Sequence, residues 1–321
     1  MFGEGKMKFS KYLISLLAFM VIFTISANAA KYAGEFLNLG VGARPIALGG
    51  AYVAEGSDIL GGYYNPAGLA SLAEPQAAFM HSEAFGALLN HDFLAYARPI
   101  GTGENKAAMA ASLYLLGGGG IAITGRDQTG RFYKIKSESH TDLAGYFSYG
   151  RMFGERMSGG VSAKVIYRDI VDQSAFGLGL DLGARYTLTN WIDLGLNLQD
   201  ISTTLLSYST GTKESIFPTA KIGARFHSGR GRLLGSIYTD ADVRFEGRDY
   251  AAQISAGPVS ADTHLGLEIS YLEKLAARIG SDAGNLTLGA GLKFGRFNVD
   301  VAMRDHSDLE NTYLVSLAAR F

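Results

Sequence analysis

Strict alternation of apolar residues with small or polar ones is the main pattern along this chain. In 176–186, Phe, Leu, Ala and Tyr occupy every second position, and glycine or charged residues stand between them. A period of two indicates a β-strand with two different faces. The same alternation follows the turn at Asn190 and recurs in 286–294 and 297–303. The chain is therefore predicted to be all-β in its fold class.

Fourteen antiparallel strands are predicted, and several run for about 9 to 11 residues, the length that a tilted strand needs to cross a bilayer. A soluble β-sandwich also alternates, but globular strands are usually about five or six residues long. The predicted strands lie near 76–86, 91–100, 106–125, 139–151, 157–169, 174–188, 191–200, 217–227, 231–244, 261–271, 275–282, 286–294, 297–304 and 312–321.

The connections between these strands alternate between short turns and long loops. The long ones are predicted at 126–138, 201–216, 245–260 and 305–311. Short periplasmic turns, longer external loops and an even strand number are typical of a transmembrane outer-membrane β-barrel. Both ends of the barrel segment are then expected in the periplasm.

Charged residues and glycine fill the inward faces of the predicted strands. With a turn centred on Glu273, Glu268 is placed opposite Arg278, where opposite charges pair across strands. We expect this lumen charge pair to be partly wetted and worth about 1 kcal/mol or less. The composition of these faces predicts a polar lumen and argues against a wide apolar conduit in the lower barrel, whereas the upper part near Ile121 to Ile135 could still hold one.

The first residues form a separate element. Lys6, Lys8 and Lys11 precede an apolar run, 12–25, and Ala27-Asn28-Ala29 follows it. This order is typical of a cleaved secretory signal peptide, predicted at 1–29. The run of fourteen residues is shorter than the about 20 that a membrane-spanning helix needs.

One later stretch also lacks charge, from Ala107 to Thr124. Four consecutive glycines, Gly117 to Gly120, would cost a helix about 4 kcal/mol. A long strand with a glycine kink or bulge is the better interpretation.

The composition narrows the function classes. The chain has 42 glycines, no cysteine, and 29 basic against 30 acidic residues, for a net charge of -1. The absence of cysteine excludes disulfides and Cys-ligated metals, and the balanced, interspersed charge offers no footprint for nucleic acid. No linker or low-complexity stretch divides the mature chain, which is therefore predicted to be one domain.

No spaced metal motif or catalytic motif is found. The six histidines form no HExxH pattern. Asp305, His306, Ser307 and Asp308 are hydrolase residue types, but adjacent residues cannot adopt triad geometry. The predictions are no metal, no cofactor and no enzymatic activity. Ile121, Ile123, Phe132 and Ile135 flank an external loop, where they either line a ligand entrance or simply rim the barrel.

The segment Phe36 to Leu72 precedes the first strand and does not alternate. It is rich in glycine and ends near Asn65-Pro66-Ala67-Gly68. Pro is preorganised for a first helical turn and Asn before it can cap that turn. The tetrapeptide is therefore predicted to be a turn or a helix start.

This glycine-rich stretch followed by the NPAG tetrapeptide resembles the amino-terminal hatch of the FadL superfamily of outer-membrane transport proteins. The opening 36–44 and the run 264–280 are more similar to its PorV/PorQ branch. The resemblance implies a fourteen-stranded barrel with an N-terminal lumenal hatch. The expected divisions are signal peptide 1–29, hatch 30–75 and barrel 76–321, in the bacterial outer membrane.

The resemblance also implies functions. PorV-type members serve type IX protein secretion, which makes secreted cargo proteins the expected partners. The alternative is a FadL-type passive channel for long-chain fatty acids or other hydrophobic ligands. Outer-membrane lipid and the barrel-assembly machinery are further expected partners, because Tyr313, the alternating positions after it and the terminal Phe321 resemble the signal that this machinery reads.

Overall fold

The computed structural model describes residues 33–56, 58–101, 106–248, 252–306 and 309–321. The predicted signal peptide, 1–29, lies outside the described residues. No helix among the described residues is long and apolar enough to cross a membrane.

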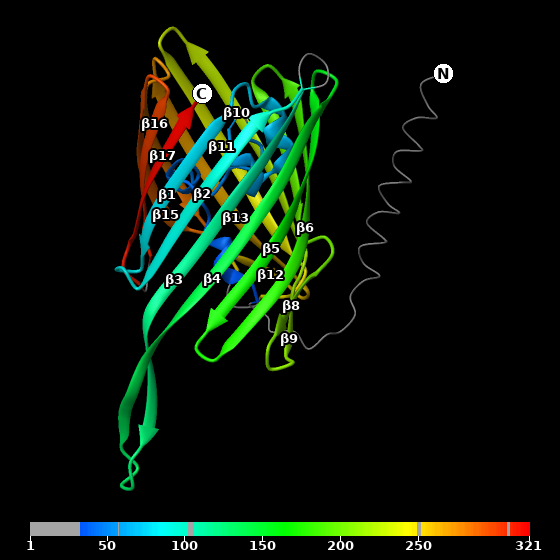
Figure 1. Ribbon diagram of the computed structural model, residues 1–321. Helices are drawn as coiled ribbons and strands as arrows, with labels where there is room; N and C mark the ends of the chain where they lie inside the picture. Colours follow the sequence, from blue (N-terminus) through cyan, green and yellow to red (C-terminus); the bar gives the residue numbers. More distant parts are fainter. Residues whose placement is uncertain (1–32, 57, 102–105, 249–251, 307–308) are drawn as a thin grey trace. The chain divides into compact units, whose positions relative to one another are not determined.

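Fourteen antiparallel strands form a closed barrel, as predicted (Figure 1). The last strand pairs with the first from Gln76↔Arg320 to Glu83↔Tyr313, which closes the circle. The strands are β1 (Gln76–Ala84), β2 (Leu89–Pro99), β3 (Ala107–Arg126), β4 (Phe132–Phe153), β5 (Met157–Ile170), β6 (Gln173–Thr189), β7 (Ile192–Gln199), β10 (Thr219–Arg230), β11 (Leu233–Arg244), β13 (Val259–Tyr271), β14 (Leu275–Asp282), β15 (Asn285–Phe294), β16 (Phe297–Arg304) and β17 (Thr312–Arg320).

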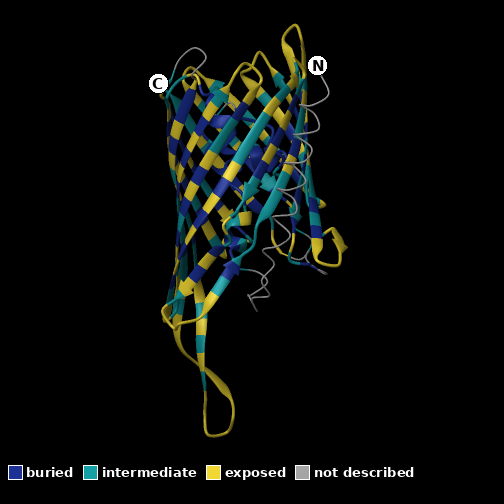
Figure 2. Cartoon of the chain, turned by 90° about the vertical axis from the view of Figure 1, so that its right-hand side faces the viewer, coloured by how far each residue is buried: buried dark blue, intermediate teal, exposed yellow. Residues whose placement is uncertain are grey.

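The outer face of the wall is apolar. Burial alternates along the strands, so that dark and light bands follow one another around the barrel in Figure 2. Leu94, Phe147 and Leu178 are typical of the outer positions and are 57%, 66% and 60% exposed. Such a surface favours contact with lipid, as in a membrane-spanning barrel.

The two ends of the barrel differ. The connections after β2, β4, β6, β10, β13 and β15 are short and lie at what we call the short-turn end, whereas the loops after β3, β7, β11 and β16 lie at the long-loop end. Two long loops contain further strands. The predicted loop 201–216 holds a hairpin of β8 (Thr204–Tyr208) and β9 (Lys213–Ile216), and the predicted loop 245–260 holds β12 (Ile254–Ala256).

The predicted loop 126–138 is wrong in extent, because β4 already begins at Phe132. The distal parts of β3 and β4 pair only with each other beyond Gly118 and His140, and they project past the barrel as a two-stranded ribbon (Figure 1). The predicted glycine kink is a register shift between Gly118 and Ile121. Apolar and polar residues continue to alternate into this ribbon, and no other described strand pairs with it.

The segment before β1, which we call the hatch (33–75), lies inside the barrel. It contains four short helices, η1 (Glu35–Asn38), α2 (Ala43–Ala47), α3 (Gly61–Tyr64) and η2 (Pro66–Ser71). Most hatch side chains from Val41 to Leu72 are buried, so the main core of this protein lies between the hatch and the inner wall.

Candidate functional site: the hatch and the lumen

The hatch runs through the barrel from the long-loop end to the short-turn end. At the long-loop end, the Tyr114 hydroxyl donates to the carbonyl of Phe36, and Arg248 pairs with Glu35. At the other end, η2 packs on β4, β5 and β6 close to their short turns. The hatch therefore fills much of the length of the lumen.

Inward glycines let the hatch backbone touch the wall. A Cβ added to Gly160 would lie 2.3 Å from the Pro66 carbonyl carbon, and one added to Gly183 would lie 2.1 Å from Asn65 Oδ1. No residue larger than glycine fits at such distances. The same close approach to hatch backbone is found at Gly195, Gly266 and Gly280. These inward glycines, predicted to face the lumen, are therefore docking positions for the hatch.

The tetrapeptide Asn65 to Gly68 lies in the barrel interior and is fully buried. Asn65 Oδ1 accepts a hydrogen bond from the Ala67 amide at 3.1 Å and so caps η2, with Pro66 at the first helical position. Its Nδ2 donates to the carbonyl of Val53 at 2.8 Å and to that of Ala184 at 3.1 Å. Asn65 thus joins two parts of the hatch to the wall.

Arg44 is the centre of a second attachment, which we call the latch: Arg44, Glu55, Asp58, Arg225 and Glu268. Arg44 Nη2 lies 3.2 Å from Glu55 Oε2 and 3.0 Å from Glu268 Oε1. Arg44 Nη1 lies 3.5 Å from Asp58 Oδ2. Because Glu268 and Arg225 belong to wall strands while the other three belong to the hatch, the latch ties the hatch to the wall by charge.

Glu55 is the most buried member of the latch, with a side chain that is 0% exposed. Arg225 Nη1 lies 3.1 Å from Glu55 Oε2, and the Tyr238 hydroxyl donates to the same oxygen at 3.1 Å. Burial alone would raise the pKa of this carboxyl, but the guanidinium groups of Arg44 and Arg225 hold that pKa well below its usual range. Glu55 therefore stays ionised and paired.

Glu268 and Arg278 face each other in the β13–β14 ladder. Arg278 Nε donates to Glu268 Oε2 at 2.6 Å, and Arg278 Nη1 donates to Asp300 Oδ1 at 2.7 Å. Both residues are buried, at 9% and 8% exposed, so this pair is drier than expected. Arg44, which was not predicted to join them, also pairs with Glu268 and makes the pair part of the latch.

The larger part of the inner wall, formed by the nine barrel strands from β5 to β16, is ionic, and we call it the ionic half. Its charged side chains pair across strands. Examples are Lys164–Asp181 at 2.9 Å, Lys221–Asp242 at 2.7 Å and Arg304–Asp282 at 2.8 Å.

The other half, β1 to β4, is mainly apolar, contrary to the predicted polar lumen. Met80, Phe93, Tyr114 and Ala144 are directly opposed in successive ladders and form one continuous row across the four strands. Each is at most 1% exposed. Both faces of β2 and β3 carry apolar side chains, so the alternation of apolar and polar residues does not show which face of these strands points into the barrel.

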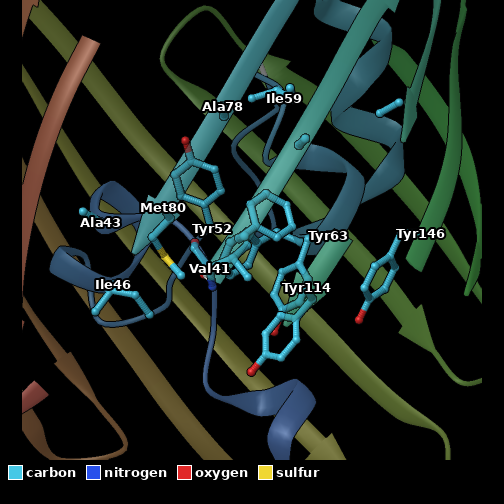
Figure 3. Close-up of a cluster of buried hydrophobic side chains, with 14 of the residues drawn as sticks. Val41, Ala43, Ile46, Tyr52, Ile59, Tyr63, Ala78, Met80, Tyr114 and Tyr146 are labelled. Carbon is cyan, nitrogen blue, oxygen red and sulfur yellow. Dashed lines mark hydrogen bonds between the residues drawn. The ribbon is translucent and has the colours of Figure 1, made fainter. Parts of the chain in front are cut away.

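Hatch aromatics pack on this apolar half (Figure 3). The Tyr63 ring contacts those of Phe93 and Tyr146 with centroids 6.4 Å and 5.7 Å apart, and Phe36 contacts Tyr114 at 5.9 Å. Edge-to-face packing of this kind is favourable but needs no specific polar partner. The hatch thus covers the apolar half with rings and binds the ionic half with charges.

Two adjoining cavities remain at the short-turn end. The larger, which we call the vestibule, has a volume of about 440 Å³ and is lined mainly by polar residues, among them Arg44, Lys274, Arg278 and Arg320. The smaller, of about 90 Å³, lies between the hatch and β1, β16 and β17, and shares Arg44 and Arg320 with the vestibule.

The remaining predicted residues lie apart from these features. Tyr313, on the outer face of β17, is 58% exposed, and Phe321 follows that strand at 62% exposed. His306 packs against Phe85, whereas Ser307 and Asp308 lie outside the described residues. Among the described residues, no three His, Asp or Glu side chains cluster as a metal site.

The fold is similar to those of several solved hydrocarbon channels. The Ralstonia pickettii toluene transporter TbuX superposes with a TM-score of 0.60 at 13% identity, over 88% of this chain and 98% of that one. The CymD monoaromatic hydrocarbon channel gives the same values. A Pseudomonas aeruginosa FadL homologue gives a TM-score of 0.53 at 12% identity, over 84% and 95%. No protein-family model matches the sequence, and no curated protein matches it significantly.

Proposed function

We propose that this protein is a passive outer-membrane channel for small hydrophobic molecules, with the short-turn end in the periplasm. The observation that carries the proposal is the continuous apolar row from Met80 to Ala144 on the inner wall. The likeness of the whole fold to channels named for toluene and monoaromatic hydrocarbons supports it.

The apolar half provides the route. A hydrophobic solute gains about 25 cal/mol for each Å² of apolar surface that leaves water, and the row offers such a surface through the wall. On the ionic half, the same solute would displace buried charge pairs, which costs several kcal/mol. The channel then selects apolar solutes because only the apolar half of the lumen opens.

Transport requires the hatch to move. The hatch residue Tyr63 is 6% exposed and packs on Phe93 of the row, so its ring covers the route in this state. The aromatic contacts between hatch and wall are short-range packing, and a hydrophobic solute can replace them with contacts of its own. The latch holds the opposite side of the hatch, so the hatch can shift on the apolar half while it remains attached at Arg44.

Uptake of labelled toluene by bacteria that lack channels of this kind tests the proposal. Cells that produce this chain should accumulate toluene faster than cells that do not. An Ala110→Trp variant narrows the apolar half and should abolish the gain, whereas a Gly145→Ala variant, whose added Cβ meets nothing within 4 Å, should retain it. Equal uptake with and without the protein would refute the proposal.

A role in protein secretion of the PorV type stays a second proposal, favoured by the ribbon of β3 and β4. Its side chains Phe132, Tyr133 and Ile135 are 66%, 53% and 58% exposed beyond the barrel. Such a surface could bind an exported protein. If this proposal holds, shortening the ribbon should release a secreted protein from the cell surface without changing toluene uptake.

A further inference from the structure

The smaller cavity has an apolar floor. Its floor is formed by side chains from the hatch and from the first two strands: Ile59, Leu60, Ala78, Met80 and Phe93. Figure 3 labels Met80, Ala78 and Ile59 among the buried hydrophobic side chains. Met80 and Phe93 also begin the apolar row, so the cavity lies at the short-turn end of the proposed route. A solute that travels along the row reaches this cavity before the vestibule.

The cavity is also lined by polar residues, and one of them is a hydrogen-bond acceptor without a donor. Asn298 Oδ1 is buried and has no hydrogen-bond partner among the described residues. Its side chain lines both the cavity and the vestibule. A buried carbonyl oxygen without a donor is unfavourable, so a ligand that supplies an O–H or N–H at this point is favoured.

The volume limits the ligand. An apolar cavity of about 150 Å³ holds benzene, and this one offers about 90 Å³ before it opens toward the vestibule. This volume is smaller than that of a benzene-binding cavity, so a single ring fits only where its polar group extends past Asn298 into the adjoining vestibule, and a long acyl chain does not fit. Arg320 also lines the cavity, with its Nη1 3.9 Å from Glu74 Oε1.

We propose that this cavity is a binding site for small, uncharged, ring-sized molecules that carry one hydroxyl group, with the ring against Met80 and Phe93 and the hydroxyl donating to Asn298 Oδ1. The inference rests on the proposed function for the route by which the molecule arrives. The binding site itself is defined independently of that route, by the smaller cavity and the acceptor Asn298 Oδ1.

Phenol and toluene form a matched pair of probes, because they have nearly the same shape and only phenol donates a hydrogen bond. Equilibrium dialysis of each labelled compound against the full-length barrel in detergent, with detergent alone subtracted, measures binding. Phenol should bind more tightly than toluene. An Asn298→Leu variant should weaken phenol about 3- to 10-fold, the size of one hydrogen bond, and leave toluene unchanged or tighter.

A filling variant checks the location. Ala318 lines the cavity, and its neighbour Ala319 points to the outer face of the same strand. Ala318→Phe should weaken both probes at least about tenfold, a loss of about 1.4 kcal/mol, while Ala319→Phe should change neither. Equal thermal unfolding of the two variants shows that the barrel is intact.

The outcomes separate this inference from the proposed function. Phenol binding that does not depend on Ala318 or Asn298 would overturn the site. Binding that depends on both, in a protein that does not increase toluene uptake by cells, would support the site and refute the transport proposal.

Discussion

Replacement of Arg44 by Met should release the hatch without unfolding the barrel. The change removes the guanidinium that contacts Glu55, Asp58 and Glu268 and leaves Glu55, which is 0% exposed, with Arg225 as its remaining cation in the latch. Breaking a buried ion pair costs about 3–5 kcal/mol. Because the Arg44 side chain is itself 21% exposed, we take the lower end, about 3 kcal/mol, which raises the population of undocked hatch on the order of 100-fold.

The assay is single-channel conductance in planar bilayers at neutral pH. Arg44→Met should open often where the wild type stays closed, and its heat-modifiable mobility on gels should show that the strand ladders persist. Arg304→Met is the matched control, because Arg304 pairs with Asp282 on the wall at 2.8 Å and makes no ion pair with the described hatch. The reasoning is refuted if both variants open equally or if Arg44→Met stays closed.

Three further predictions concern the hatch and the chain end. Gly160→Ala should lower the temperature at which the hatch becomes sensitive to protease, because its Cβ would meet the Pro66 carbonyl carbon, whereas Gly145→Ala should not. The pKa of Glu55 is depressed in the folded protein. The stability that ionised Glu55 gives to the docked hatch is therefore complete above its ordinary pKa of about 4.3, and it is lost as the pH falls through the folded-state pKa. Conductance should therefore stay low from about pH 7 to about pH 5 in the wild type, and Glu55→Gln should open over that whole range. Deletion of Phe321 should reduce the fraction of heat-modifiable, assembled barrel in cells, and an unchanged fraction would remove the proposed assembly signal.

The barrel was predictable because its pattern is local. In strands such as β6 and β15, alternating Leu and Gly positions specify the two faces within a few residues. The β2 and β3 strands were harder, because Phe93 faces the lumen and Leu94 faces outward, and both are large and apolar. Which face is inward there depends on the closure of the barrel.

The contacts between hatch and wall were harder to predict from the sequence. The partner of Gly160 is Pro66, and no local pattern joins these two residues. Arg44 does carry a signal in the sequence. It is the only charged residue between Phe36 and Ala54, and a cation in a segment expected to fill a barrel needs a carboxylate partner. Its partner Glu268 was predicted to face the lumen, but their proximity depends on the folded hatch.

The central claim is that hydrophobic solutes cross along the apolar half when the hatch moves. An engineered disulfide between hatch and wall tests this claim most directly, because the chain has no cysteine of its own. A Cβ built on Gly62 lies 3.5 Å from the Cβ of Ala110, within the range of about 3.5–4.5 Å for a disulfide. The Gly62→Cys/Ala110→Cys variant therefore joins the hatch to the apolar half of the wall. We predict that the oxidised variant takes up no more toluene than cells without the protein, and that reduction restores uptake to the level of the single variants. Full uptake by the oxidised variant would contradict a route through the apolar half.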